Sequence, residues 1–163
     1  MGAPDATRLI LPSRATSLAD ARRFVDQHAV QAGFSPMARD EISLAVTEAV
    51  SNAVQYGSPA GEADTVEVSV MQNGPRLIIT VRDHGRPFTP PTPSLPDPAA
   101  FAEHGRGLFL MQQLMDDVRF SRDDGTVVCM TKTRQPGTRA AGDGGPSPSA
   151  APRGAAPRRI GDT

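Results

Sequence analysis

Hydrophobic positions alternate with polar ones in several short stretches, which predicts β-strands. Residues 66–70 alternate, the turn signal Asn73-Gly74-Pro75 follows, and residues 77–81 alternate again. A period of two on both sides of a turn is typical of an antiparallel hairpin. A second hairpin is predicted over residues 118–133 around Asp123-Asp124-Gly125. Leu9 and Leu11 indicate a short first strand.

Other segments repeat their apolar positions with helical spacing. One helix is expected from about Ser17, because Ser17 and Asp20 have the spacing of a capping box. A second is expected to be capped by Ser35, with Pro36 at its first position, and to run to Tyr56 before a glycine ends it.

A third helix is predicted to open after Gly105-Arg106-Gly107, with apolar residues at helical spacing: Leu108, Met111, Leu114, Met115 and Val118. Helices and hairpins in this order indicate an α+β fold. The last strand includes Cys129, which we expect to be buried and inert.

Composition divides the chain into one domain and a tail. The length of 163 residues, 38% of them hydrophobic, suits a single core, which we assign to residues 1–134. Residues 135–163 are rich in Gly, Pro, Ala and Arg, and are expected to be a disordered tail. Inside the domain, prolines in residues 86–104 exclude a regular helix and predict a long loop, either a lid or binding loop or a disordered insertion.

Charge and cysteine content exclude some function classes. The formal net charge of −1 provides no field that would gather DNA or an anionic membrane surface. The single cysteine rules out an intramolecular disulfide and suits a reducing compartment. The N-terminus lacks a secretory signal pattern and no stretch is apolar enough to span a bilayer. We therefore expect a cytoplasmic protein.

The second predicted helix carries Glu48 and Asn52 four residues apart, so both project from one face. The amide oxygen of an asparagine can bind Mg²⁺, and a carboxylate can deprotonate a hydroxyl, which suits phosphoryl transfer. The same two residue types are also common on solvated helix faces.

Two further motifs have chemistry that suits a nucleotide. Asp83, at a strand end, can accept a hydrogen bond from an exocyclic amine, while Gly85 permits close approach of a flat ring. The Gly105-Arg106-Gly107 segment precedes a helix, where free N–H groups and the helix dipole attract phosphate. Ordinary turn chemistry and a flexible hinge are the simpler explanations of each motif alone.

The order of the three motifs is more specific. Glu48-Ala-Val-Ser-Asn52, Asp83-His-Gly85 and Gly105-Arg-Gly107-Leu108 resemble the N box and the two glycine boxes of the Bergerat-fold (GHKL) ATPases. In its compact size and in the residues of the three motifs, the chain is most similar to the bacterial anti-sigma-factor serine/threonine kinases. The resemblance covers roughly residues 9–134. It implies a two-layer sandwich with helices on one face of a mixed, largely antiparallel sheet.

By that resemblance, the ligands are ATP or ADP with Mg²⁺. Asn52 would ligate the magnesium and Glu48 would be the general base towards a protein serine. Asp83 would bind the adenine amine beside Gly85. The four residues Gly105, Arg106, Gly107 and Leu108 would form the phosphate end of the site.

The resemblance also implies partners. A kinase of this type would bind a sigma factor and phosphorylate that factor's antagonist, which controls transcription by partner switching, and homodimers are expected through the sheet. The alternative is a non-catalytic module in which nucleotide only stabilises a protein-binding surface. A histidine-kinase catalytic domain is disfavoured because no phosphoacceptor helix precedes the motifs.

Overall fold

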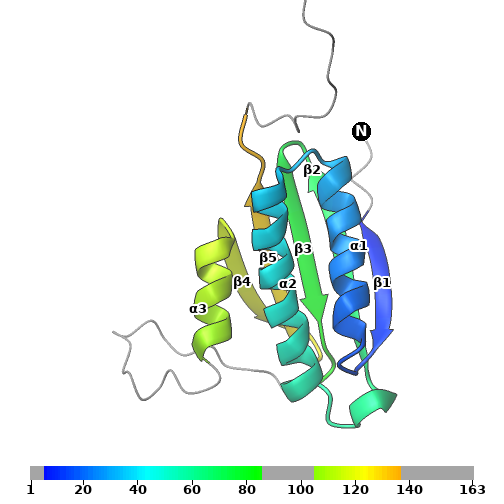
Figure 1. Cartoon of the computed structure of the whole chain (residues 1–163). Helices are drawn as coiled ribbons and strands as arrows, with labels where there is room; N and C mark the ends of the chain where they lie inside the picture. Colours follow the sequence, from blue (N-terminus) through cyan, green and yellow to red (C-terminus); the bar gives the residue numbers. More distant parts are fainter. Residues whose placement is uncertain (1–5, 86–104, 137–163) are drawn as a thin grey trace, which may run out of the picture.

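The computed structural model describes residues 6–85 and 105–136 of the chain, which form a layer of helices on a β-sheet (Figure 1). Residues 86–104 and 137–163, the predicted long loop and almost all of the predicted tail, lie outside the described residues. The elements are, in order, β1 (Thr7–Pro12), α1 (Ser17–Gln31), α2 (Pro36–Tyr56), a 3₁₀ turn (Gly61–Ala63), β2 (Thr65–Asn73), β3 (Arg76–Arg82), α3 (Gly105–Leu114), β4 (Asp117–Arg122) and β5 (Thr126–Thr133).

The five strands are arranged in the order β1-β2-β3-β5-β4. Both predicted hairpins are confirmed, since β2 pairs with β3 and β4 pairs with β5. The remaining pairs, β1 with β2 and β3 with β5, are antiparallel too, so every pairing among the described strands is antiparallel. The predicted layer architecture is confirmed, with α1, α2 and α3 on one side of this sheet (Figure 1).

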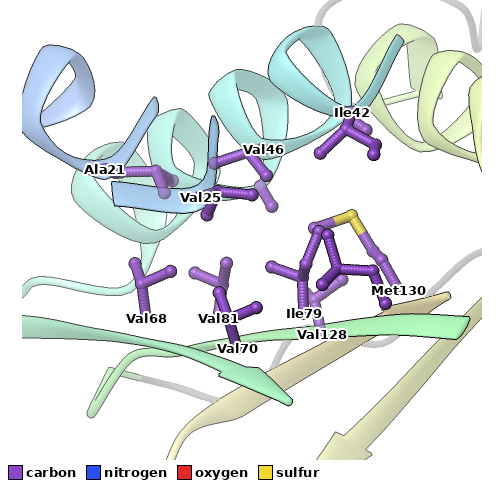
Figure 2. Close-up of a cluster of buried hydrophobic side chains, with 14 of the residues drawn as sticks. Ala21, Val25, Ile42, Val46, Val68, Val70, Ile79, Val81, Val128 and Met130 are labelled. Atoms are coloured by element: carbon purple, nitrogen blue, oxygen red, sulfur yellow. The ribbon is translucent and has the colours of Figure 1, made fainter. Parts of the chain in front are cut away.

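The core lies between the helices and the inner face of the sheet. Figure 2 shows side chains of α1 and α2, such as Val25 and Val46, pointing towards Val68 and Ile79 of the strands. These four side chains are almost completely buried. Removing apolar surface of this kind from water contributes about 25 cal/mol per Å², and it is this contact that fixes α2 across the sheet.

The two long helices begin in different ways. Ser35 caps α2 as predicted, because its Oγ accepts a hydrogen bond from the N–H of Ala38 at 3.3 Å. The predicted capping role of Ser17 is wrong. Thr16 is the cap residue of α1 and makes no capping hydrogen bond with its side chain. Ser17 is the first residue of α1; it is buried and donates its hydroxyl to the carbonyl of Pro12, 2.7 Å away, so this hydroxyl does not cap the helix.

The third helix begins earlier and ends earlier than the apolar spacing predicts. Gly105 and Gly107 lie inside α3 rather than ahead of it, and the helix ends at Leu114. Met115 follows as a buried residue outside the helix, and its N–H still bonds the carbonyl of Met111 at 2.9 Å. No helix among the described residues is both long and apolar enough to cross a bilayer.

The other face of the sheet has no described helix over it. Burial alternates along β5, with Val128 and Met130 on the inner face and Cys129 between them on the outer face. The expectation of a buried Cys129 is therefore wrong, since its side chain is only half-buried. The sequence predicted a strand here, but because several consecutive residues are apolar, it did not show which of their side chains point to the inner face.

Candidate functional site

Two of the sequence motifs meet where α3 packs on α2. A Cβ atom added to Gly107 would lie 2.7 Å from Oε2 of Glu48 and 3.5 Å from Nδ2 of Asn52. The α3 backbone therefore lies directly against these two polar side chains, and a side chain at position 107 would displace the Glu48 carboxylate. The helical spacing of Glu48 and Asn52 places both on the edge of α2 that faces α3.

The carboxylate of Asp83 is held at the end of β3. Its Oδ1 accepts hydrogen bonds from the backbone N–H groups of Thr126 and Gly85, both at 3.0 Å. The N–H of Asp83 in turn donates to the carbonyl of Thr126 at 3.0 Å. The residue is only 6% exposed. These bonds fix the side chain in one orientation, and a fixed acceptor can select its partner by geometry.

Burial raises the pKa of the Asp83 carboxyl above its ordinary value, and the N–H groups of Thr126 and Gly85 oppose that rise. Desolvation disfavours the charged form, whereas hydrogen bonds to the carboxylate favour it. Perturbed acids in clefts occur often at functional sites.

Glycines pack around Asp83 where there is no space for side chains. A Cβ on Gly57, the residue that ends α2, would lie 2.2 Å from Cγ of Asp83. A Cβ on Gly85 would lie 2.5 Å from the backbone of Gly57. Gly125 has φ +134°, and a Cβ there would lie 2.0 Å from the Asp83 carbonyl oxygen. The end of α2, the end of β3 and the β4–β5 turn thus converge on Asp83.

A pocket of about 570 Å³, its open mouth included, joins these features. Its lining combines apolar side chains with a few fixed polar groups, as small-molecule sites do. The lining residues are Ala49, Asn52, Ala53, Tyr56, Gly57, Val81, Asp83, Leu108, Met111, Phe120, Thr126 and Val128.

Three of the predicted site residues, Asn52, Asp83 and Leu108, line the pocket directly. The others lie around it. Glu48 and Gly107 adjoin Asn52, and Gly85 adjoins Gly57. Gly105 and Arg106 begin α3, where Arg106 is exposed.

Several lining residues were not predicted from the motifs. Gly57 was expected only to end a helix, and Thr126 only to begin a strand. Tyr56 and Phe120 also line the pocket. The one available signal was the Asp-Asp-Gly turn directly before Thr126, since a tight turn can bring the following residue back to the neighbouring strand.

This arrangement suits a flat heterocycle with an anionic chain. The apolar floor can bury a ring while the fixed Asp83 carboxylate accepts a hydrogen bond from an amine on its edge. At the other end, a carboxylate and a carboxamide lie beside the first turn of α3, whose dipole favours anions. A carboxamide oxygen is a hard ligand that fits Mg²⁺, which usually keeps waters and substrate phosphates as its other ligands. Among the residues described, no cluster of three or more His, Cys, Asp or Glu side chains could hold a metal ion.

Comparison with known proteins gives the class of this site. Residues 11–132 match the family model of the histidine kinase-like ATPase domain. The chain belongs to this family. The match includes all three motifs and extends from the end of β1 to β5.

Individual relatives narrow the class. The chain is 31% identical over 136 residues to the serine-protein kinase RsbW of Listeria monocytogenes serovar 1/2a, with 78% of this chain and 87% of the relative covered. It is 33% identical over 139 residues to the serine-protein kinase RsbW of Listeria innocua, with the same coverage. The protein is thus an ATP-binding protein kinase of the anti-sigma-factor type, as its motifs predict.

Solved structures support the fold. The RsbU and RsbW domains of a Mycobacterium tuberculosis protein match with a TM-score of 0.61 at 17% identity, covering 80% of this chain and 32% of that one. The catalytic domain of the histidine kinase ThkA matches with a TM-score of 0.50 at 12% identity, over 83% of this chain and 99% of that one.

Proposed function

We propose that this protein transfers the γ-phosphoryl group of ATP to a serine of an anti-sigma antagonist, and that it binds a sigma factor when the antagonist is phosphorylated. The observation that carries the proposal is the contact of Gly107 with Glu48 and Asn52, because it joins the phosphate-binding motif to the acid–amide pair. The names of the RsbW relatives support the choice of serine as acceptor.

Adenine occupies the apolar part of the pocket in this proposal. The carboxylate of Asp83 accepts a hydrogen bond from the exocyclic amine, and the close packing of Gly85 against Gly57 keeps side chains out of the ring's position. Fixing the acceptor in advance makes this bond selective for a base with an amine at that edge, since a base with a carbonyl there would leave two acceptors facing each other.

The phosphates lie along the α2–α3 contact. The N–H groups of Gly105 and Gly107 face them at the start of α3, Leu108 contacts the nucleotide in the pocket, and the exposed Arg106 contacts the γ-phosphate. Asn52 supplies the protein ligand for Mg²⁺. When bound, the ion neutralises charge on the phosphate oxygens.

Glu48 acts as the general base. It accepts the proton of the serine hydroxyl as the serine oxygen bonds to the γ-phosphorus, and the bond to the bridging oxygen breaks to release ADP. Its place one turn before Asn52 on α2, beside Gly107 of α3, supports this role.

We assign this reaction to a domain of residues 1–134. Two copies pair through the face of the sheet that no described helix covers. Met71, Ile78 and Val127 on that face are half-buried apolar side chains, and a second copy would remove them from water.

The test begins with calorimetric titration of the full chain with Mg-ADP and Mg-ATP. Saturable binding that Asn52→Ala and Asp83→Ala both weaken supports the site. The full chain is then incubated with Mg-ATP and purified antagonist candidates. Serine phosphorylation that Glu48→Ala abolishes while ADP binding persists supports the kinase mechanism. Nucleotide binding with no transfer to any candidate would instead favour a non-catalytic, nucleotide-stabilised interaction module.

A further inference from the structure

Lys132 of β5 lies at the end of α3 that is remote from the candidate site. Its ammonium group is 2.7 Å from Oε2 of Glu41 on α2, and its side chain is only 14% exposed. The same group donates a hydrogen bond to the carbonyl of Leu114, the last residue of α3, at 2.5 Å. One cation therefore ties α2, α3 and the sheet together.

The position suits a cation for an electrostatic reason. The last carbonyl groups of a helix have no partner within the helix and carry the negative end of its dipole. A charge-assisted bond to such a carbonyl is roughly twice as strong as a neutral one.

The chain after α3 is fixed to the same strand. The N–H of Asp116 donates to the carbonyl of Thr131 at 2.9 Å, and the N–H of Thr133 donates to Oδ2 of Asp116 at 2.6 Å. Lys132 stands between these two strand residues. The C-terminal end of α3 is thus its anchored end.

The opposite end of α3 packs closely on α2. Gly107 is in close contact with Glu48, as its missing Cβ would lie only 2.7 Å from Oε2. At a rise of 1.5 Å per residue, roughly 10 Å of helix separate Gly107 from Leu114. A tilt or shift of α3 at its anchored end is therefore transmitted to the N–H groups that face the phosphates.

We propose that Lys132 is a positioning residue that sets the phosphate end of the nucleotide site through α3. This inference rests on the proposed ATP site and adds to it a residue that touches no nucleotide. It distinguishes the two ends of the site, because the carboxylate of Asp83 is held by Thr126 and Gly85, neither of which belongs to α3.

The experiment compares Mg-ADP with adenosine, which lacks phosphates. Both are titrated into full-length wild type, Lys132→Met and Lys132→Arg, with adenosine measured by displacement of ADP. Lys132→Met is expected to bind Mg-ADP about tenfold more weakly, the cost of losing one charge-assisted alignment, and to bind adenosine within about twofold of wild type. Lys132→Arg, which keeps the charge, is expected to recover most of the ADP affinity.

Arg39→Met is the matched control. It breaks the ion pair of Arg39 with Asp26, which joins α2 to α1 at 2.7 and 2.8 Å on the side of α2 away from α3. Loss of global stability lowers the apparent affinities for ADP and adenosine by the same factor, so this variant is expected to keep their ratio.

The inference is overturned if Lys132→Met leaves the ratio of ADP to adenosine affinity unchanged, or if Lys132→Arg is as impaired as Lys132→Met. The inference is also overturned if wild type binds adenosine as tightly as Mg-ADP, because the phosphates then add no affinity. Failure of wild type to bind ADP at all would be a failure of the proposed function itself, and would leave Lys132 with no phosphate site to position.

Discussion

Gly57 lies so close to Asp83 that a Cβ atom on the glycine would be 2.2 Å from Cγ of the carboxylate. The carboxylate cannot move away from Gly57 without breaking the hydrogen bonds that its Oδ1 accepts from the N–H groups of Thr126 and Gly85. The residue that ends α2 thus sets the position of the acceptor that, in our proposal, recognises adenine.

Gly57→Ala is expected to abolish detectable Mg-ADP binding and to destabilise the fold by about 1–3 kcal/mol, the usual cost of overpacking. Calorimetry and thermal unfolding measure the two effects. Gly74→Ala is the control, since Gly74 has φ +58° but nothing within 4 Å of an added Cβ. It carries backbone strain of roughly 1 kcal/mol and should keep its ADP affinity. Normal ADP binding by Gly57→Ala would contradict the proposed adenine position.

Gly107→Ala is expected to separate stability from activity. Alanine is favoured over glycine in a helix by about 1 kcal/mol, so thermal unfolding should show no loss of stability. The new methyl group would push Oε2 of Glu48 out of place, because it would lie 2.7 Å away. ATP turnover, followed as phosphate release from full-length protein, is expected to fall at least tenfold, since small displacements of catalytic groups are costly. Unchanged turnover would argue against Glu48 as the base.

The elements of the fold could be predicted where local signals define them. The cap at Ser35, the proline after it and the terminating glycine define α2 almost to the residue, and turn signals define both hairpins. The capping prediction for Ser17 was wrong because its hydroxyl bonds the carbonyl of Pro12 in the segment before the helix. Local spacing contains no information on such competition.

The chemistry of the site was predictable only in part for a related reason. Glu48, Asn52 and Asp83 belong to motifs with a recognisable order along the chain. The need for glycine at position 57 and the hydrogen bond from Thr126 arise from contacts between segments far apart in sequence. The same holds for Lys132, whose partners Glu41 and Leu114 lie on two other elements.

The ion pair of Arg39 with Asp26 is expected to stabilise the packing of α1 on α2. The guanidinium contacts both carboxylate oxygens, at 2.7 and 2.8 Å, and both side chains are partly exposed. Exposed pairs are typically worth 0.2–1 kcal/mol, with well-aligned bidentate arginine pairs the most favourable. A double-mutant cycle with Arg39→Met and Asp26→Asn, measured by urea unfolding, should therefore give a coupling of about 1 kcal/mol that falls at high salt. A coupling near zero would show that the bidentate geometry contributes nothing.

The raised pKa of Asp83 predicts opposite pH effects on nucleotide binding and on folding. Since burial raises the pKa in the folded state above its ordinary value of 3.8, the folded chain binds more protons between the two values. The stability contributed by this carboxyl is then fully present below the unfolded value and lost as the pH rises through the folded one.

Adenine recognition needs the ionised acceptor, so Mg-ADP affinity should fall as the pH is lowered through the folded pKa. Calorimetry from pH 7 downwards, on wild type and Asp83→Asn, checks this. The variant has no titrating group at this position, so its weaker residual binding should lack that component of the pH dependence. Thermal unfolding of the same samples should show that wild type loses stability as the pH rises through the folded pKa of Asp83, and that the variant lacks this pH-dependent loss. If the Mg-ADP affinities of wild type and variant change with pH in the same way, the carboxylate of Asp83 is not the group that hydrogen-bonds the adenine amine.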